Sequence, residues 1–301
     1  MKSLAMGATI LKEALVAWNE DRVPRLGAAL AYYTLFSLAP LLMIVVAVAS
    51  LVFGEQAAQG QIADEIKGLV GDKGADAIQA ILQNAGARKS SGVVATVIGI
   101  TTLLFGASGV FGELQDALNT IWGVKPKPGR GVLGIVRSRF FSFAMVLGIV
   151  FLLLVSLVVS AALAAFGKFG GGTVPTPLFH IVDLVVSIVV VAVLFATIFK
   201  ILPDVRIAWR DVWIGAFATS VFFTFGKILI GLYLGRSSVG SAFGAAGSLV
   251  VVLVWIYYSA QILFLGAELT KAYAHQHAPA VVPTADAVPV KDEVRRVERA
   301  A

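Results

Sequence analysis

Lys227 and Asp183 are ionisable residues that lie inside two long apolar stretches of the sequence. An ionisable side chain in the hydrocarbon core costs about 2.5 to 3.5 kcal/mol on insertion scales, so it is usually functional and has a partner. If the two stretches form antiparallel helices, the two residues differ in depth by about 6 Å, which a lysine can bridge. We therefore predict a Lys227–Asp183 pair. The alternative is a Lys227 that extends to the outer headgroups.

Two hydroxyl residues share a helical face with Lys227. Ser220 and Thr224 precede it by seven and three positions, which places all three side chains along one stripe of a helix. We expect this stripe to face the interior of a helix bundle, because lipid cannot satisfy polar groups.

A second polar face lies in the stretch Gly244–Lys271, which carries no charge before Glu268. Tyr257, Gln261 and Glu268 fall within roughly 40° of one another on a helical wheel. Such a face must contact other helices or water inside a bundle. We predict that it lines the polar interior.

Pro40 interrupts another apolar stretch, and Tyr33 and Ser37 precede it by seven and three residues. A proline inside a helix removes one backbone hydrogen bond and usually kinks the helix, and nearby polar side chains can satisfy the freed groups. The kink is either a packing feature or a break that coordinates a ligand.

The composition explains why these polar residues are unusual. Of the 301 residues, 58% are hydrophobic and only 14% are charged, against roughly 25% charged in soluble proteins. The mean hydropathy is +0.88. We therefore expect an all-α integral membrane protein, a polytopic bundle of transmembrane helices.

Apolar length predicts six transmembrane helices, since about 20 residues cross a bilayer. Residues 1–25 form a cytoplasmic amphipathic segment, and 54–90 form a small amphipathic helical cap outside the cytoplasm. Residues 274–301 are expected to be a disordered cytoplasmic tail. The membrane domain covers 26–273, with spans at about 26–53, 92–111, 140–166, 181–202, 212–234 and 247–270.

The lysines and arginines are concentrated in alternate connections. The positive-inside rule then places both termini in the cytoplasm. This also explains the net charge of +6 without nucleic acid, which we do not expect as a partner. Four arginines form a cytoplasmic rim that suits an anionic headgroup: Arg137, Arg139, Arg206 and Arg210.

Enzymatic chemistry has little support in the sequence. The chain has three histidines and no cysteine, which is too few ligands for a histidine-rich two-metal site. No phosphate-binding loop, nucleophile elbow or dinucleotide fingerprint is present. We therefore expect no cofactor, no metal and no catalytic residue.

Four segments together resemble the YihY/BrkB family of bacterial inner-membrane proteins. They are AALAYYTLFSLAPLL at 28–42, LQDALNTIW at 114–122, LPDVRIAWRDVWIGA at 202–216 and GAAGSLVVVLVWIYYSAQILFLGAELT at 244–270. The resemblance covers about residues 10–275 and leaves out the tail after Ala278. It implies six helices, cytoplasmic termini and a role in the cell envelope. Some members have been labelled ribonuclease BN, and no catalytic residues can be carried over.

These observations favour a transporter or flippase-like protein for an anionic lipid or another amphipathic envelope precursor. The alternative is a scaffold that organises envelope proteins without transport. A membrane-associated ribonuclease is the third reading and has the least support. Membrane lipids are the expected partners, and a homo-oligomer is compatible with the sequence.

Overall fold

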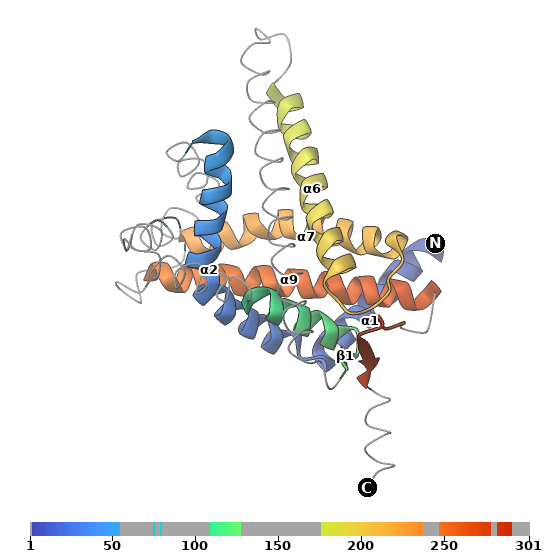
Figure 1. Ribbon diagram of the computed structural model, residues 1–301. Coiled ribbons are helices and arrows are strands. Elements are labelled where there is room, and N and C mark those ends of the chain that lie inside the picture. Colours follow the sequence, from blue (N-terminus) through green and yellow to red (C-terminus); the bar gives the residue numbers. More distant parts are fainter. Residues whose placement is uncertain are drawn as a thin grey trace.

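The computed structural model describes residues 2–54, 75, 79, 109–127, 176–236, 247–277 and 282–290. In these residues the chain is mostly helical, as the composition predicts. Residues 109–121 are helical without a label of their own. The labelled elements are α1 (Lys2–Glu20), α2 (Val23–Phe53), β1 (Val124–Pro126), α6 (Thr176–Ile201), α7 (Trp209–Arg236), α9 (Gly247–His277) and β2 (Ala287–Pro289) (Figure 1).

Three helices in the described part of the chain are long and apolar enough to cross a membrane. Their apolar segments are Leu184–Ile201, Trp209–Ile230 and Leu249–His277, close to the predicted spans 181–202, 212–234 and 247–270. Helix α2 coincides with the predicted span 26–53. The predicted span 140–166, most of the span 92–111 and most of the cap 54–90 lie outside the described residues. Six spans and the cap therefore stay predictions.

Helices α7 and α9 run antiparallel and pack through glycines (Figure 1). A Cβ atom built on Gly215 would lie 3.1 Å from the Cα of Thr270, and one built on Gly266 would lie 2.8 Å from the Cβ of Thr219. Each threonine hydroxyl donates to the carbonyl of the glycine four residues earlier in its own helix, at 2.6 and 2.7 Å. Small residues therefore let the two helices approach closely.

Helix α2 packs on another side of α9. Leu35, Leu38 and Leu42 contact Val252 and its neighbours on α9. Figure 1 shows that α2 bends partway along, so that its second part turns away from α9. Pro40 lies near the middle of the helix and is the residue type that produces such a bend.

Helix α6 crosses α7 instead of running beside it along its whole length. The ring centroids of Phe195 and Phe223 are 5.8 Å apart at the contact. The N-terminal part of α6 extends away from α7 and α9 (Figure 1). The connection from α6 to α7 has seven residues, 202–208.

The tail contains an ordered segment, contrary to our expectation of disorder from residue 274. Helix α9 continues to His277, and β2 pairs antiparallel with β1, with Val124 opposite Pro289. An isolated bridge joins Val205 to Pro283. The tail therefore pairs with the backbone of residues 124–126 and of Val205. Hydropathy does not reveal such backbone pairing. We call the region where residues 119–127, 202–208 and 282–290 meet the basal end.

Candidate functional site

Gln261 lies between α9 and α2 with its amide buried. A Cβ atom on Gly27 of α2 would lie 3.2 Å from the Cδ of Gln261 and 3.6 Å from the ring of Tyr257, so the glycine leaves room for both side chains. Neither the oxygen nor the nitrogen of the amide has a hydrogen-bond partner among the described residues. A buried amide without partners is costly, and in native proteins it calls for an explanation.

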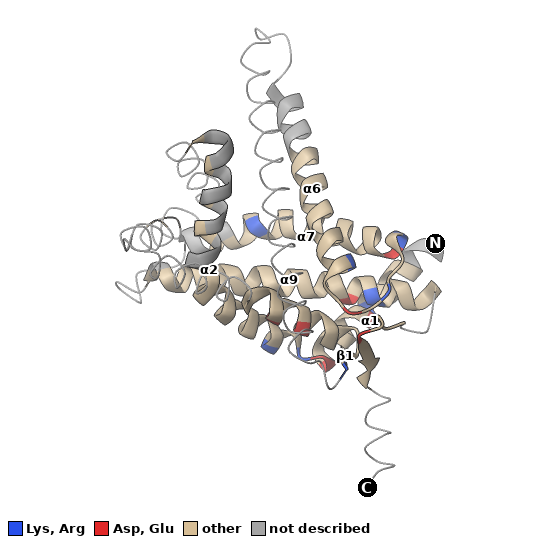
Figure 2. Ribbon diagram, in the orientation of Figure 1, with Lys and Arg blue, Asp and Glu red and all other residues tan. Residues whose placement is uncertain are grey.

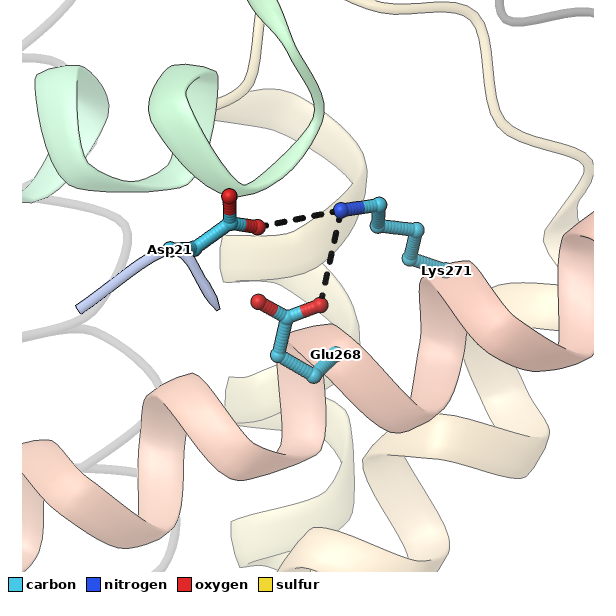
Figure 3. A network of polar contacts seen from close by, with 3 residues as sticks. All are labelled: Asp21, Glu268 and Lys271. Atoms are coloured by element: carbon cyan, nitrogen blue, oxygen red, sulfur yellow. Dashed lines mark hydrogen bonds and ion pairs between the residues drawn. The ribbon is translucent and has the colours of Figure 1, made fainter. Parts of the chain in front are cut away.

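Glu268 is the most completely buried charged residue of α9, with 0% exposure. Neither carboxylate oxygen has a hydrogen-bond partner in the described part of the chain. The Nζ of Lys271 lies 3.6 Å from Oε2 of Glu268 and 3.1 Å from Oδ2 of Asp21, so it bridges the two acids (Figure 3). This arrangement joins α9 to the turn between α1 and α2.

Asp21 reaches Lys271 because of an unusual turn. Arg22 has a φ angle of 51°, in the left-handed region, where a residue other than glycine carries roughly 1 to 2 kcal/mol of strain. The turn ends α1 at Glu20 and starts α2 at Val23, with Pro24 in its first turn. The predicted N-terminal segment 1–25 therefore contains the start of α2 as well as α1.

The two hydroxyls of the predicted α7 stripe are buried and satisfied. Ser220 donates to the carbonyl of Phe217 at 2.8 Å, and Thr224 donates to the carbonyl of Ser220 at 2.8 Å. Lys227 on the same helix is half-buried. The two hydroxyls thus bond within α7 itself. Of the three residues in the stripe, Lys227 is therefore the candidate for contact with a substrate.

The predicted Lys227–Asp183 pair stays a prediction, since the side chain of Asp183 lies outside the described residues. The crossing of α6 and α7 argues against it. Phe195 contacts Phe223 where the two helices cross, and Asp183 lies twelve residues before Phe195, on the part of α6 that extends away from α7 (Figure 1). Twelve residues correspond to about 18 Å along a helix, which exceeds the reach of a lysine side chain.

Tyr33 and Ser37 lie one turn apart on α2, and both are close to Gly109. A Cβ atom added to Gly109 would be 3.6 Å from the hydroxyl of Ser37 and 3.9 Å from the ring of Tyr33. Ser37 is only 3% exposed, whereas Tyr33 is 45% exposed and stacks edge-on with Tyr32, with ring centroids 5.8 Å apart. Ser37 therefore belongs to the packed interior, and Tyr33 lies at its edge.

Two arginines of the predicted rim are exposed: Arg206 in the connection between α6 and α7, and Arg210 in the first turn of α7. The other two, Arg137 and Arg139, fall outside the described residues. Figure 2 shows that most of the coloured charges gather around the basal end and the neighbouring end of α9, while the middle of α9 is uncharged. This is the distribution expected at one face of a membrane bundle.

Sequence reasoning missed the contacts that centre on Asp204. Its carboxylate accepts from Asn119 at 3.0 Å and from Gln115 at 3.4 Å, and its own N–H donates to Asn119 Oδ1 at 2.7 Å. Asn119 is 2% exposed. These residues come from two of the family-like segments, LQDALNTIW and LPDVRIAWRDVWIGA. Their presence in these two segments was the signal in the sequence that could have indicated a contact.

Lys200 was also not predicted as a site residue. Its Nζ donates to the carbonyl of Ile207 and lies 5.4 Å from the ring centre of Trp209. The lysine therefore fastens the end of α6 to the beginning of α7. No group of three or more histidines and acids that could hold a metal occurs among the described residues.

A family model described as virulence factor BrkB matches residues 14–290. The chain belongs to the BrkB family. The match includes the tail segment 282–290, so the predicted end of the resemblance at Ala278 is wrong. Family membership together with the apolar helices makes this BrkB-family chain an integral membrane protein.

Curated relatives of this BrkB-family chain are named UPF0761 membrane proteins. The relative from Ralstonia nicotianae is 26% identical over 85% of this chain and 56% of its own length. The one from Mannheimia succiniciproducens is 24% identical over 84% of this chain and 85% of its own. YihY of Salmonella typhimurium is 30% identical over 58% of each chain.

The chain spans just over half the length of the relatives from Ralstonia nicotianae and Rhodospirillum centenum, at 56% and 54%. No solved structure matches the chain.

Proposed function

We propose that this BrkB-family protein moves an anionic lipid, or another amphipathic envelope precursor, across the bacterial inner membrane. The proposal includes six spans, both termini in the cytoplasm and no catalytic activity. Membrane lipids are its partners. Transport by such a protein needs a polar path between helices that lipid tails cannot fill.

The observation that carries the proposal is the buried polar face of α9. The amide of Gln261 and the carboxylate of Glu268 are buried without hydrogen-bond partners among the described residues. Polar and ionisable groups at such positions in a span usually mark a substrate or ion pathway. A headgroup that passes between α9 and α2 would give the amide of Gln261 a partner, while Glu268 faces the ammonium of Lys271.

The exposed Arg206 and Arg210 support an anionic substrate. They stand on either side of the start of α7, close to where Lys200 contacts Trp209. Guanidinium groups bind phosphates with two parallel hydrogen bonds, which favours phospholipid headgroups. They would collect an anionic headgroup before it enters the path.

The test is reconstitution into vesicles that contain fluorescent phosphatidylglycerol or fluorescent phosphatidylcholine. We expect the protein to speed the movement of labelled phosphatidylglycerol between leaflets, and Gln261→Leu to slow it severalfold. Leu253→Ala is the matched control, because Leu253 is exposed on the same helix. Protein that moves neither lipid at high occupancy would contradict transport and favour the scaffold.

The proposal also predicts that the protein has no ribonuclease activity. Purified protein freed of soluble nucleases should leave RNA intact, since its three histidines and lack of cysteine offer few groups for metal or nucleophilic catalysis. Glu113 and Asp116 are two acids one turn apart on the helix 109–121, a spacing that could bind a cation. RNA cleavage that disappears specifically in Glu113→Gln or Asp116→Asn protein would show an enzyme.

The proposed topology can be tested independently of transport. The chain has no cysteine, so a cysteine introduced singly at Gln59 or Gly171 can be labelled selectively. We expect both to react with an impermeant reagent added outside intact cells. Outside labelling of Lys127→Cys would reverse the orientation.

A further inference from the structure

Helix α1 is packed against the membrane-spanning helices and does not stand free. Its Ala14 is fully buried and contacts Leu269 and Ala272 of α9. Ile10, one turn earlier, packs in the same cluster with Leu265 of α9 and Ala218 of α7. Both partner helices belong to candidate membrane spans.

The depth of this contact follows from the length of α9. Its apolar segment begins at Leu249, and about 20 residues cross the hydrocarbon core. The core then ends near Glu268, between Leu265 and Leu269. Helix α1 is therefore held at the boundary between hydrocarbon and headgroups, where an amphipathic helix can bury one face in lipid.

The two flanks of α1 differ in polarity. At about 100° per residue, Leu11 and Leu15 lie about 60° and 100° from Ala14 on one side, and Glu13 and Glu20 lie about 100° and 120° away on the other. Leu11 is 41% exposed and Leu15 is 49% exposed. One flank next to the packed face is thus apolar and open, and the other is acidic.

Apolar side chains extend from this flank to neighbouring parts of the surface. A shallow hollow of about 590 Å³ lies along the outer side of α1, with Leu11, Leu15 and Val16 in its lining and the polar Lys12, Asn19 and Glu20 beside them. On α7, Ile214 lies one turn from Ala218 on the same face and is 43% exposed. Exposed apolar side chains at this depth, next to spans, are suited to lipid tails, and Lys12 can extend to a phosphate.

We propose that α1 is an interfacial helix whose Leu11–Leu15 flank is embedded in the lipid leaflet at the basal end. The occupant of this surface is lipid, and Glu13 and Glu20 face water. This goes beyond a cytoplasmic amphipathic segment, and it does not depend on transport.

Single nitroxide labels test the assignment, since the chain has no cysteine of its own. The full-length protein is labelled at Leu11→Cys, Leu15→Cys, Glu13→Cys or Glu20→Cys and placed in vesicles of phosphatidylethanolamine with a minority of phosphatidylglycerol. Collision with oxygen reports lipid, and collision with a nickel complex reports water. Leu229→Cys, exposed on α7, is the lipid reference, and Asp116→Cys, exposed on the helix 109–121, is the water reference.

We expect a severalfold higher oxygen-to-nickel ratio at positions 11 and 15 than at 13 and 20. Ratios at positions 11 and 15 that equal the Asp116 reference would overturn the proposal. Dipolar broadening between labels at Leu15→Cys would also overturn it, because a second copy would then cover the flank. The four sites are exposed, so labelling should leave the fold intact, and circular dichroism checks this.

Discussion

Gly215 of α7 and Thr270 of α9 face each other so closely that a Cβ atom on the glycine would lie 2.8 Å from the Cβ of the threonine. Gly266 of α9 and Thr219 of α7 repeat the relationship in the opposite direction. Both pairs have the sequence pattern Gly-Ala-x-x-Thr, at 215–219 and 266–270. The antiparallel contact is therefore locally symmetric, and its closeness depends on the two glycines.

Gly215→Ala and Gly266→Ala should each destabilise the folded protein. The added methyl meets a threonine whose hydroxyl is already bonded to its own helix, and overpacking of this kind costs about 1 to 3 kcal/mol. Thermal unfolding in detergent measures the loss. Gly7→Ala on α1 is the control, because nothing lies within 4 Å of its added Cβ, and it should gain up to about 1 kcal/mol from helix propensity. Equal behaviour of all three variants would contradict the close contact.

The tail segment 282–290 should protect specific backbone amides at the basal end. The N–H of Lys127 donates to the carbonyl of Asp286 at 3.0 Å, and the N–H of Arg206 donates to the carbonyl of Val282 at 2.9 Å. Deleting residues 282–301 removes both acceptors, so these amides should exchange faster with deuterium. The measurement is hydrogen exchange of full-length and shortened protein.

The amide of Asp204 is an internal control for this experiment. It donates to Oδ1 of Asn119 and not to the tail, so its exchange should change little. Unchanged exchange at Lys127 and Arg206 in the shortened protein would show that the strand does not form. Faster exchange at all three amides would mean that the tail supports the whole basal end.

Apolar length predicted the positions of α6, α7 and α9 well, because a bilayer sets a minimum length for each span. The same reasoning could not find β2, since Ala287, Val288 and Pro289 have no strand pattern. Its partners are loop backbones more than 150 residues away in the chain. Such long-range pairing depends on where the helices place the loops, which a single sequence does not show.

Some residues of the candidate site could be predicted from the sequence and others could not. Gln261 and Glu268 could be predicted as a buried polar face, because polar residues in a span must avoid lipid. Gly27 and Asp21, which complete this face, looked like an ordinary glycine and an ordinary charged residue of a loop. Their roles follow from the packing of α2 and from the strained turn at Arg22.

Glu113 should make stability depend on pH. It is half-buried on the helix 109–121, and burial, followed by the charge of Asp116, raises the pKa of its carboxyl above 4.5. The folded state then holds a proton that the unfolded state releases, in the pH range just above 4.5. The free energy of unfolding should therefore fall as the pH rises through this range and remain lower at neutral pH.

Chemical unfolding at a series of pH values tests this prediction. Glu113→Gln should remove the slope and stabilise the protein at neutral pH. Asp116→Asn should narrow the pH range over which the free energy of unfolding falls, because it removes the second cause of the raised pKa of Glu113. A slope that persists in Glu113→Gln protein would assign the titration to another group.

The last prediction concerns Lys227 and Asp183. Helix α6 crosses α7 at the contact between Phe195 and Phe223, and Asp183 lies about 18 Å before Phe195 along α6, which separates it from Lys227. The stability effects of Lys227→Met and Asp183→Asn should then add within about 0.5 kcal/mol in the double variant, as they do for separated sites. Thermal unfolding of the four proteins in detergent gives this coupling energy.

A paired lysine would behave differently. Breaking a buried ion pair by removing one partner costs about 3 to 5 kcal/mol, and removing both charges restores much of that loss. Recovery of stability in the double variant would establish the pair and show that the N-terminal part of α6 approaches α7 more closely than the crossing indicates. Additivity would exclude the pair, and the proposed transport function then predicts that Lys227 contacts the anionic headgroup of the substrate. Lys227→Met should in that case slow phosphatidylglycerol movement while leaving thermal stability near that of the parent.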